Sequence, residues 1–128
     1  MRILVVEPER RPEVREIDGS LKSMQDVVGG WIQALNPFAE PDVALVCNDE
    51  GRLLGLPLNR ALYEPGSRIP YDIISGTFFI CGVPADSEHF ESLTDAQIQQ
   101  YTERFSVPEL FFRLNGQIIA VPIKASDK

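Results

Sequence analysis

The sequence predicts an α+β fold: a mostly antiparallel sheet of hairpins packed by two helices, at about residues 20–35 and 95–105. Three observations support this class. Short β-branched and aromatic runs recur between turns that contain glycine, proline or asparagine. Two stretches place apolar residues at helical spacing behind a capping residue. The 128 residues suffice for one hydrophobic core, so we expect residues 1–128 to form a single domain.

Two short strands are expected at the start of the chain, over residues 3–7 and 13–17. Prolines between them close each strand, because proline cannot donate a hydrogen bond to a ladder. A helix follows, with Ser20 as its N-cap and apolar residues at helical spacing up to Leu35. The next dipeptide, Asn36-Pro37, ends this helix.

A glycine pair, Gly29 and Gly30, falls inside this predicted helix. Each glycine costs about 1 kcal/mol relative to alanine there, so the pair needs a structural reason. Either another backbone crosses closely at this point, or the helix breaks and Trp31 begins a new element. We favour the close crossing, because the apolar spacing continues through the pair.

The next segment predicts a hairpin and a helical turn. Strands over 43–48 and 52–56 would flank a turn that places Gly51 at a positive φ. Residues 57–62 would then form one helical turn with Pro57 near its start.

Two further runs, 71–74 and 77–81, are rich in β-prone residues. Ser75 and Gly76 interrupt them. Glycine inside a strand weakens it and often marks an irregularity, so we expect a bulge or bend within one strand pair.

The last third of the chain predicts a helix and a hairpin. A capping box from Thr94 to Gln97 opens the helix. Asn115-Gly116 between apolar runs is typical of a two-residue hairpin loop. The flanking strands would cover 110–114 and 117–123. The alternative is that residues 108–114 extend the helix.

Composition excludes several classes of function. The net charge of −7 argues against direct nucleic-acid binding, which needs a basic face. No apolar run approaches the ~18 residues of a membrane span. The amino terminus becomes acidic at Glu7, too early for a secretory signal. Cys47 and Cys81 lie in apolar runs and are expected to be buried thiols in a reducing cytoplasm. We therefore expect a cytoplasmic protein with no membrane contact.

The acidic residues are unevenly distributed. Six carboxylates occur between residues 86 and 109 against one base, Arg104. They are Asp86, Glu88, Glu91, Asp95, Glu103 and Glu109. The simpler interpretation is a solvated face that keeps the protein soluble. The alternative is an acidic surface for a basic protein partner.

Catalytic and metal-binding patterns are weak. The single histidine, His89, lies in an acidic segment far in sequence from Cys47, and no Cys/His spacing resembles a zinc site. We therefore expect no catalytic residue, no metal and no cofactor. Among the carboxylates, Asp72 between Tyr71 and Ile73 is the candidate for acid–base chemistry, and an edge-strand or bulge position is the simpler explanation for it.

Three polar residues are the candidates for ligand contact: Asn48, Asn59 and Arg60. An arginine at this position could bind an anionic group through two hydrogen bonds. The alternative is that the asparagines satisfy turn backbone and that Arg60 faces solvent. The remaining distinctive residues are assigned to architecture. They are Gly29, Gly30, Trp31, Pro57, Gly76, Asn115 and Gly116.

Several segments along nearly the whole chain resemble sequences of the bacterial family called domain of unknown function 3846. These segments are Val5-Val6-Glu7-Pro8, Val28-Gly29-Gly30-Trp31-Ile32, Cys47-Asn48-Asp49-Glu50-Gly51, Gly55 to Leu62, Ile74 to Phe79, Phe111 to Leu114 and Ile118 to Pro122. The resemblance implies a small bacterial protein often encoded on conjugative elements, plasmids or phages. It implies no activity, cofactor or catalytic residue.

Together, these observations favour a non-enzymatic cytoplasmic accessory protein of mobile-element or phage type. Its expected partner is an unidentified protein or a small anionic ligand, and self-association is left open. The alternative is an antidefence protein, acting as an acidic decoy for a host DNA-binding protein or as a sponge for a nucleotide signal. A small hydrolase is the remote alternative, because pairs of carboxylates cannot be judged from sequence.

Overall fold

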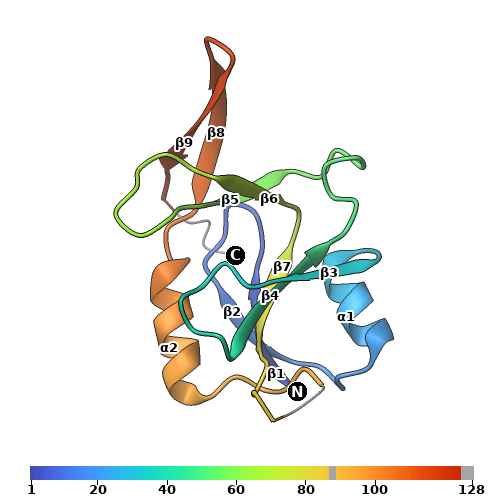
Figure 1. Ribbon diagram of the computed structural model, residues 1–128. Helices are drawn as coiled ribbons and strands as arrows, with labels where there is room; N and C mark the ends of the chain where they lie inside the picture. Colours follow the sequence, from blue (N-terminus) through green and yellow to red (C-terminus); the bar gives the residue numbers. More distant parts are fainter. Residues whose placement is uncertain (87–88, 125–128) are drawn as a thin grey trace.

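A five-stranded antiparallel sheet forms the centre of the protein, in the strand order β2-β1-β7-β4-β3 (Figure 1). The computed structural model describes residues 1–86 and 89–124. The elements within these ranges are β1 (Arg2–Val6), β2 (Glu13–Glu16), α1 (Leu21–Val28), β3 (Ile32–Leu35), β4 (Val43–Asn48), β5 (Leu58–Leu62), β6 (Asp72–Ser75), β7 (Phe78–Gly82), α2 (Asp95–Arg104), β8 (Glu109–Leu114) and β9 (Gln117–Pro122). Strands β5–β6 and β8–β9 form two further two-stranded sheets. The predicted α+β class is confirmed.

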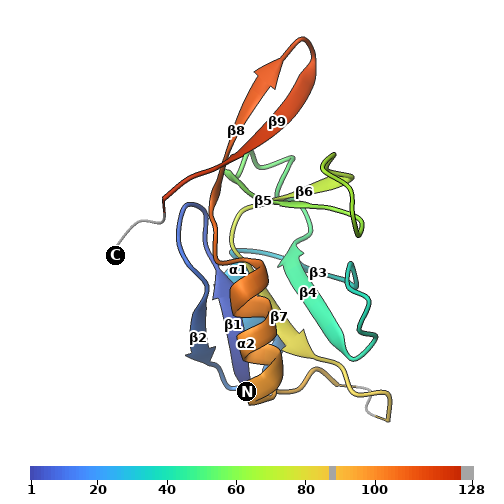
Figure 2. The same cartoon turned by 90° about the vertical axis from the view of Figure 1, so that its left-hand side faces the viewer.

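Both faces of the central sheet are covered, and this explains why its middle strands are apolar throughout. Alternate residues of β1, β4 and β7 point to opposite sides. One set packs with Met24 and Val28 of α1. The other packs with Tyr101 of α2, Phe105 just after it, and Leu62 of β5. Helices α1 and α2 therefore lie on opposite faces of the sheet (Figure 2).

The first helix is shorter than the predicted 20–35. Ser20 caps it as expected, but the helix ends at Val28, because Gly29 adopts a left-handed C-cap conformation with φ of 80°. Residues from Ile32 onward instead form β3, so the expected continuous helix with a backbone crossing is wrong. Gly30 has a separate reason: an added Cβ would lie 2.9 Å from the Asn48 side chain.

Residues 52–56, directly after the turn that follows β4, do not form a strand. The expected hairpin between 43–48 and 52–56 is wrong, because β3 and β7 already occupy both edges of β4. The chain instead coils back on itself, and the N–H of Leu56 donates to the carbonyl of Gly51. The helical turn expected at 57–62 is also wrong. This segment is β5, paired with β6, so a long-range ladder overrides the local preference.

Gly76 marks a corner between two sheets. Strand β6 before it pairs with β5, whereas β7 after it pairs with β1 and β4. The bulge expected within one strand pair at this point is therefore wrong. Gly76 has φ of 82°, and its N–H donates to the carbonyl of Pro57 at 2.7 Å. The ladder irregularity lies elsewhere, between Leu58 and Arg60 of β5.

The second helix begins at the predicted capping box. The Thr94 side chain accepts a hydrogen bond from the N–H of Gln97, and the side-chain Oε1 of Gln97 accepts one from the N–H of Thr94. The helix buries Tyr101, whose ring packs against Phe38. Its hydroxyl donates to Glu40 at the surface, and this contact lowers the pKa of the Glu40 carboxyl.

The predicted C-terminal hairpin is confirmed, and β8 settles the choice between strand and helix after residue 108. Asn115 and Gly116 have φ of 51° and 80°, the pair of positive values that a type I′ turn requires. The hairpin projects from the rest of the molecule (Figure 2).

In the described part of the chain, neither helix is long and apolar enough to span a membrane.

The corner at Gly76 provides a test of the fold. A Cβ there would lie 2.7 Å from Cδ1 and 3.3 Å from Cβ of Leu56, and φ is positive. Gly66 has a similar φ of 78° but open space around it. We expect Gly66→Ala to reduce the free energy of unfolding by about 1 kcal/mol through φ alone. Gly76→Ala should cost at least about 1 kcal/mol more, from the added steric conflict. Urea unfolding of both variants measures the difference, and equal losses would contradict this account of the corner.

Candidate functional site

Asn59 and Arg60 lie in the interior of the protein. The side chain of Asn59 donates from Nδ2 to the carbonyl of Val6 at 2.8 Å and to that of Gly76 at 2.9 Å. These bonds join the end of β1 to the corner between the two sheets. The amide of Asn59 therefore holds three segments of backbone together.

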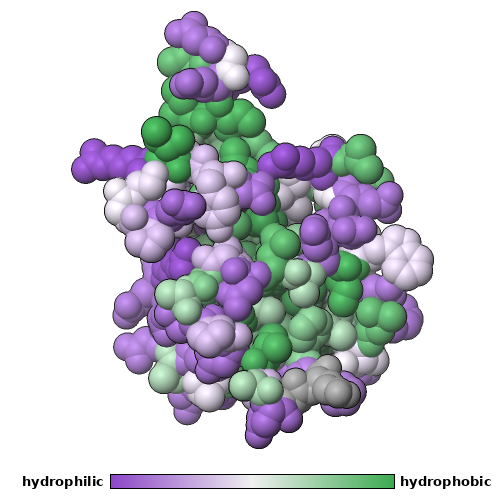
Figure 3. All heavy atoms as spheres, viewed as in Figure 1, coloured by the Kyte–Doolittle hydropathy of each residue, from purple (hydrophilic) through white to green (hydrophobic). Residues whose placement is uncertain are grey.

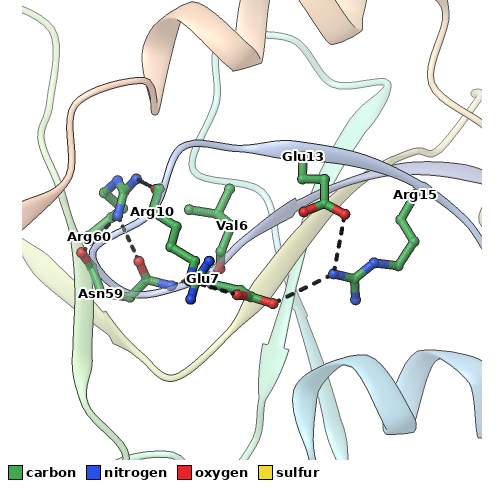
Figure 4. A network of polar contacts seen from close by, with 7 residues as sticks. All are labelled: Val6, Glu7, Arg10, Glu13, Arg15, Asn59 and Arg60. Carbon is green, nitrogen blue, oxygen red and sulfur yellow. Dashed lines mark hydrogen bonds and ion pairs between the residues drawn. The ribbon is translucent and has the colours of Figure 1, made fainter. Parts of the chain in front are cut away.

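Arg60 continues this network toward α2 (Figure 4). Its Nη1 donates to Oδ1 of Asn59 at 2.9 Å, and its Nη2 donates to the carbonyls of Arg10 at 2.6 Å and Phe105 at 2.9 Å. The residue is 2% exposed, so the alternative in which it faces solvent is wrong. Burial lowers the pKa of the guanidinium to about 10. Phe105 caps the C-terminus of α2, where carbonyl dipoles favour a cation.

Asn48 belongs to a different part of the molecule. Its Nδ2 donates to the carbonyl of Val28 at the end of α1, and its Oδ1 accepts from the N–H of Glu50. It borders a cavity of about 260 Å³ with Arg52 and Asp72, whereas Arg60 borders another cavity near α2. Within the described residues, no hydrogen bond joins Asn48 to Arg60. The three candidates therefore do not form one site, and their role in ligand contact stays a prediction.

The cavity beside Arg60 lies at the base of the hairpin and has a volume of about 380 Å³. Glu109 at the start of β8 accepts hydrogen bonds from the N–H of Ala61 at 3.0 Å and the hydroxyl of Tyr63 at 3.1 Å. Burial and the nearby carboxylate raise the pKa of Tyr63 to about 12. These contacts anchor the hairpin to β5.

The acidic stretch does not form one uniform surface in the described residues. Glu109 is bonded to β5 as above, and Asp95 pairs with Arg2. The backbone of Glu91 bridges to Gly82 of the central sheet. Glu88 lies outside the described residues. Of these carboxylates, that of Glu109 therefore contributes to the fold, whereas that of Asp95 pairs at the surface.

The residues assigned to architecture have identifiable positions. Pro57 accepts a backbone hydrogen bond from Gly76, and Gly116 with Asn115 forms the hairpin turn. Trp31 is 67% exposed beside the glycine pair, and only its backbone carbonyl connects it to the turn after β4, by accepting from Asp49.

The hairpin has an apolar face that the sequence analysis did not identify. In the pairing of β8 with β9, alternate pairs point to the same side of the hairpin. The pairs on one side are Leu110 with Val121, Phe112 with Ile119, and Leu114 with Gln117. Glu109 and Ala120 are on the opposite face, which meets the cavity beside Arg60. We define the outer face as five apolar residues that are 38% to 57% exposed. They are Leu110, Phe112, Leu114, Ile119 and Val121.

Apolar side chains gather along the projecting hairpin in the space-filling view (Figure 3). A sequence signal for this surface was available. The strands contain apolar residues in both alternating phases, so each face of the hairpin needs a cover. The body covers part of the inner face, and the outer face remains exposed.

Replacing Arg60 tests the internal network. Arg60→Met keeps most of the side-chain volume but leaves the acceptors of Arg10, Asn59 and Phe105 without their donor. We expect a loss of about 3 kcal/mol in the free energy of unfolding. The matched control is Arg113→Met on the exposed hairpin, expected within about 0.5 kcal/mol of the unchanged protein. Guanidinium chloride unfolding compares them, and equal stability of the two variants would refute the structural role of Arg60.

The two thiols offer a second test. Both cysteines are buried and free, and burial raises the pKa of Cys47 to about 11 and that of Cys81 to about 12. Because the thiolate is the reactive form, both should resist Ellman's reagent at pH 8 in the folded protein. Two thiols should react rapidly in 6 M guanidinium chloride. Rapid reaction of either thiol in the folded state would contradict this assignment.

The comparison with known families agrees with the resemblance in the sequence. The family described as Domain of unknown function (DUF3846) matches residues 1–106. The segments of β8 and β9 that also resembled the family lie beyond the matched part. No curated protein and no solved structure matches the chain. Because the match spans most of the 128 residues, the chain belongs to the DUF3846 family.

Proposed function

We propose that the protein is a non-enzymatic accessory protein of the cytoplasm that acts by binding another protein through the outer face. The observation that carries this proposal is the exposure of five apolar side chains on one face of a projecting hairpin. The mobile-element setting is part of the proposal and rests on the family resemblance.

Stability gives the first argument for a partner. An isolated two-stranded hairpin is marginally stable in water and needs a further apolar contact. Glu109 anchors the base of β8 to β5, and the carbonyl of Pro108 accepts from the N–H of Ile123. The outer face lies beyond these contacts. A partner on this face would supply the burial that the hairpin lacks.

The area of the outer face gives the second argument. Taking about 150–200 Å² for each fully open residue, a value near that of an aromatic side chain, the exposed fractions amount to roughly 400 Å² of surface, most of it apolar. A patch of this size is within the range of the largest apolar patch on a typical monomer, which is often functional. Scattered single apolar residues need no such explanation.

The other candidate functions have less support. A nucleotide sponge would use Arg60, which borders a cavity. Both of its Nη atoms already donate to protein oxygens, so among the described residues only its Nε is left without a partner. A decoy for a DNA-binding protein would use the acidic stretch. In that stretch Glu109 is bonded to β5, and Asp95 is paired with Arg2 at the surface.

Site-specific photocrosslinking tests the proposed surface. A benzophenone amino acid replaces Phe112 on the outer face, and in a matched protein it replaces Leu53, an 86% exposed leucine on the turn after β4. Irradiation of cells that carry the gene should give a discrete protein adduct from position 112 and none from position 53. A second change, Leu114→Glu, should suppress the adduct, because it places a charge in the apolar contact.

Three outcomes would count against the proposed surface. They are the absence of a discrete adduct from position 112, the same adduct from both positions, and an adduct that persists with Leu114→Glu. The mass of the adduct also reports what kind of partner is bound.

A further inference from the structure

We infer that the partner on the outer face is a second copy of this chain, so that two hairpins pack face to face about a two-fold axis. This inference rests on the proposed function and names its partner. In such an interface each copy presents the same patch, and each covers the exposed face of the other.

The chemistry of the outer face suits an identical partner. Its five residues are all apolar, and the sixth position of the face is Gln117, which is uncharged. A charged partner would find no complementary group here. A second apolar face would fit, because side chains of two stacked sheets interdigitate at a spacing of about 10 Å.

The area also matches what a stable dimer needs. A standard interface buries about 800 Å² per partner, and somewhat more than half of this is apolar, or roughly 450 Å². The outer face offers roughly 400 Å² of exposed apolar surface. One hairpin thus provides nearly the whole apolar part of a standard interface.

Repulsion between the two acidic bodies favours one orientation of the hairpins, with their tips pointing in opposite directions. Glu109 and Arg113 are the charged residues of the hairpin and cancel, whereas the whole chain has a net charge of −7. With the tips pointing in opposite directions, the acidic bodies lie at opposite ends of a ribbon about 20 Å long. Because this exceeds the screening length of about 8 Å at physiological salt, repulsion between the bodies is weak. Parallel tips would bring the bodies together.

This orientation places the middle row of the face, Phe112 and Ile119, at the two-fold axis. Leu114 at the tip then meets Leu110 and Val121 at the base of the other copy. Phe112 lies opposite its own counterpart, so one substitution changes the centre of the interface twice.

Sedimentation equilibrium of the purified protein from 1 to 100 µM tests the inference. The chain has a mass of 14.3 kDa, so a dimer of two chains has 2 × 14.3 = 28.6 kDa. We expect the dimer mass to dominate at the upper concentrations. Phe112→Asp should raise the dissociation constant by about 100-fold or more, because it removes a central aromatic and buries two like charges. The matched control is Leu53→Asp, which should leave the dimer unchanged.

A second pair of variants with opposite charges at position 112 tests the interface even if one single variant folds poorly. Phe112→Lys should also be monomeric alone, and mixing it with Phe112→Asp should restore a species of dimer mass, because opposite charges then meet at the axis. Circular dichroism of each variant should show that the central sheet and both helices are retained, since Phe112 is outside the core. A monomeric unchanged protein at 100 µM, a dimeric Phe112→Asp variant, or no recovery on mixing two folded variants would overturn the inference.

The two proposals fail in different ways. If the unchanged protein is monomeric but position 112 crosslinks to a different protein, the second-copy inference is wrong and the proposed function stands. If position 112 gives no adduct at all, the proposed function fails as well. An adduct of twice the chain mass agrees with both.

Discussion

The fold depends on the hydrogen bonds of one buried guanidinium. Both Nη atoms of Arg60 are paired, whereas its buried Nε has no hydrogen-bond partner among the described residues. Arg60 carries a charge into the interior, and the carbonyls of Arg10, Asn59 and Phe105 accept its hydrogen bonds. A buried charge without such partners would cost several kcal/mol, so the three carbonyls must stay in place together. They come from the β1–β2 loop, from β5 and from the end of α2. Asn59 adds the end of β1 and the corner at Gly76. The hydrogen bonds of Asn59 and Arg60 therefore fix the position of the small β5–β6 sheet relative to the central sheet and α2.

The same constraint sets where the C-terminal hairpin leaves the body. Phe105, which accepts from Arg60, is four residues before Glu109, and Glu109 accepts from Ala61 and Tyr63 of β5. The base of the hairpin is thus held at both sides of a short connection. Its inner face turns toward the cavity beside Arg60, and its outer face turns away. The interior network therefore helps to hold the outer face toward solvent.

Local signals in the sequence were reliable where the structure is locally determined. The N-caps at Ser20 and Thr94 and the turn at Asn115-Gly116 form as predicted, because cap and turn geometry depend on a few adjacent residues. The predicted helix and strand boundaries were wrong where they rested on the spacing of apolar residues, because tertiary contacts decide the structure there. The spacing runs through Gly29, yet a left-handed cap ends α1 there. A leucine-rich segment after Gly51 resembles a strand, yet both edges of β4 are occupied.

The sequence by itself determined the α+β class, the family, the two buried thiols and the hairpin turn. Each follows from composition, short-range capping or a pattern of adjacent residues. Only the tertiary structure decided the roles of Asn59, Arg60 and the outer face. Whether an arginine meets solvent or three carbonyls depends on segments 45 to 50 residues away in the chain. Whether an apolar strand face is core or surface depends on what packs against it. Both are long-range packing questions. The apolar residues in both phases of β8 and β9 show that each face needs a cover, but they do not say which face the rest of the chain covers.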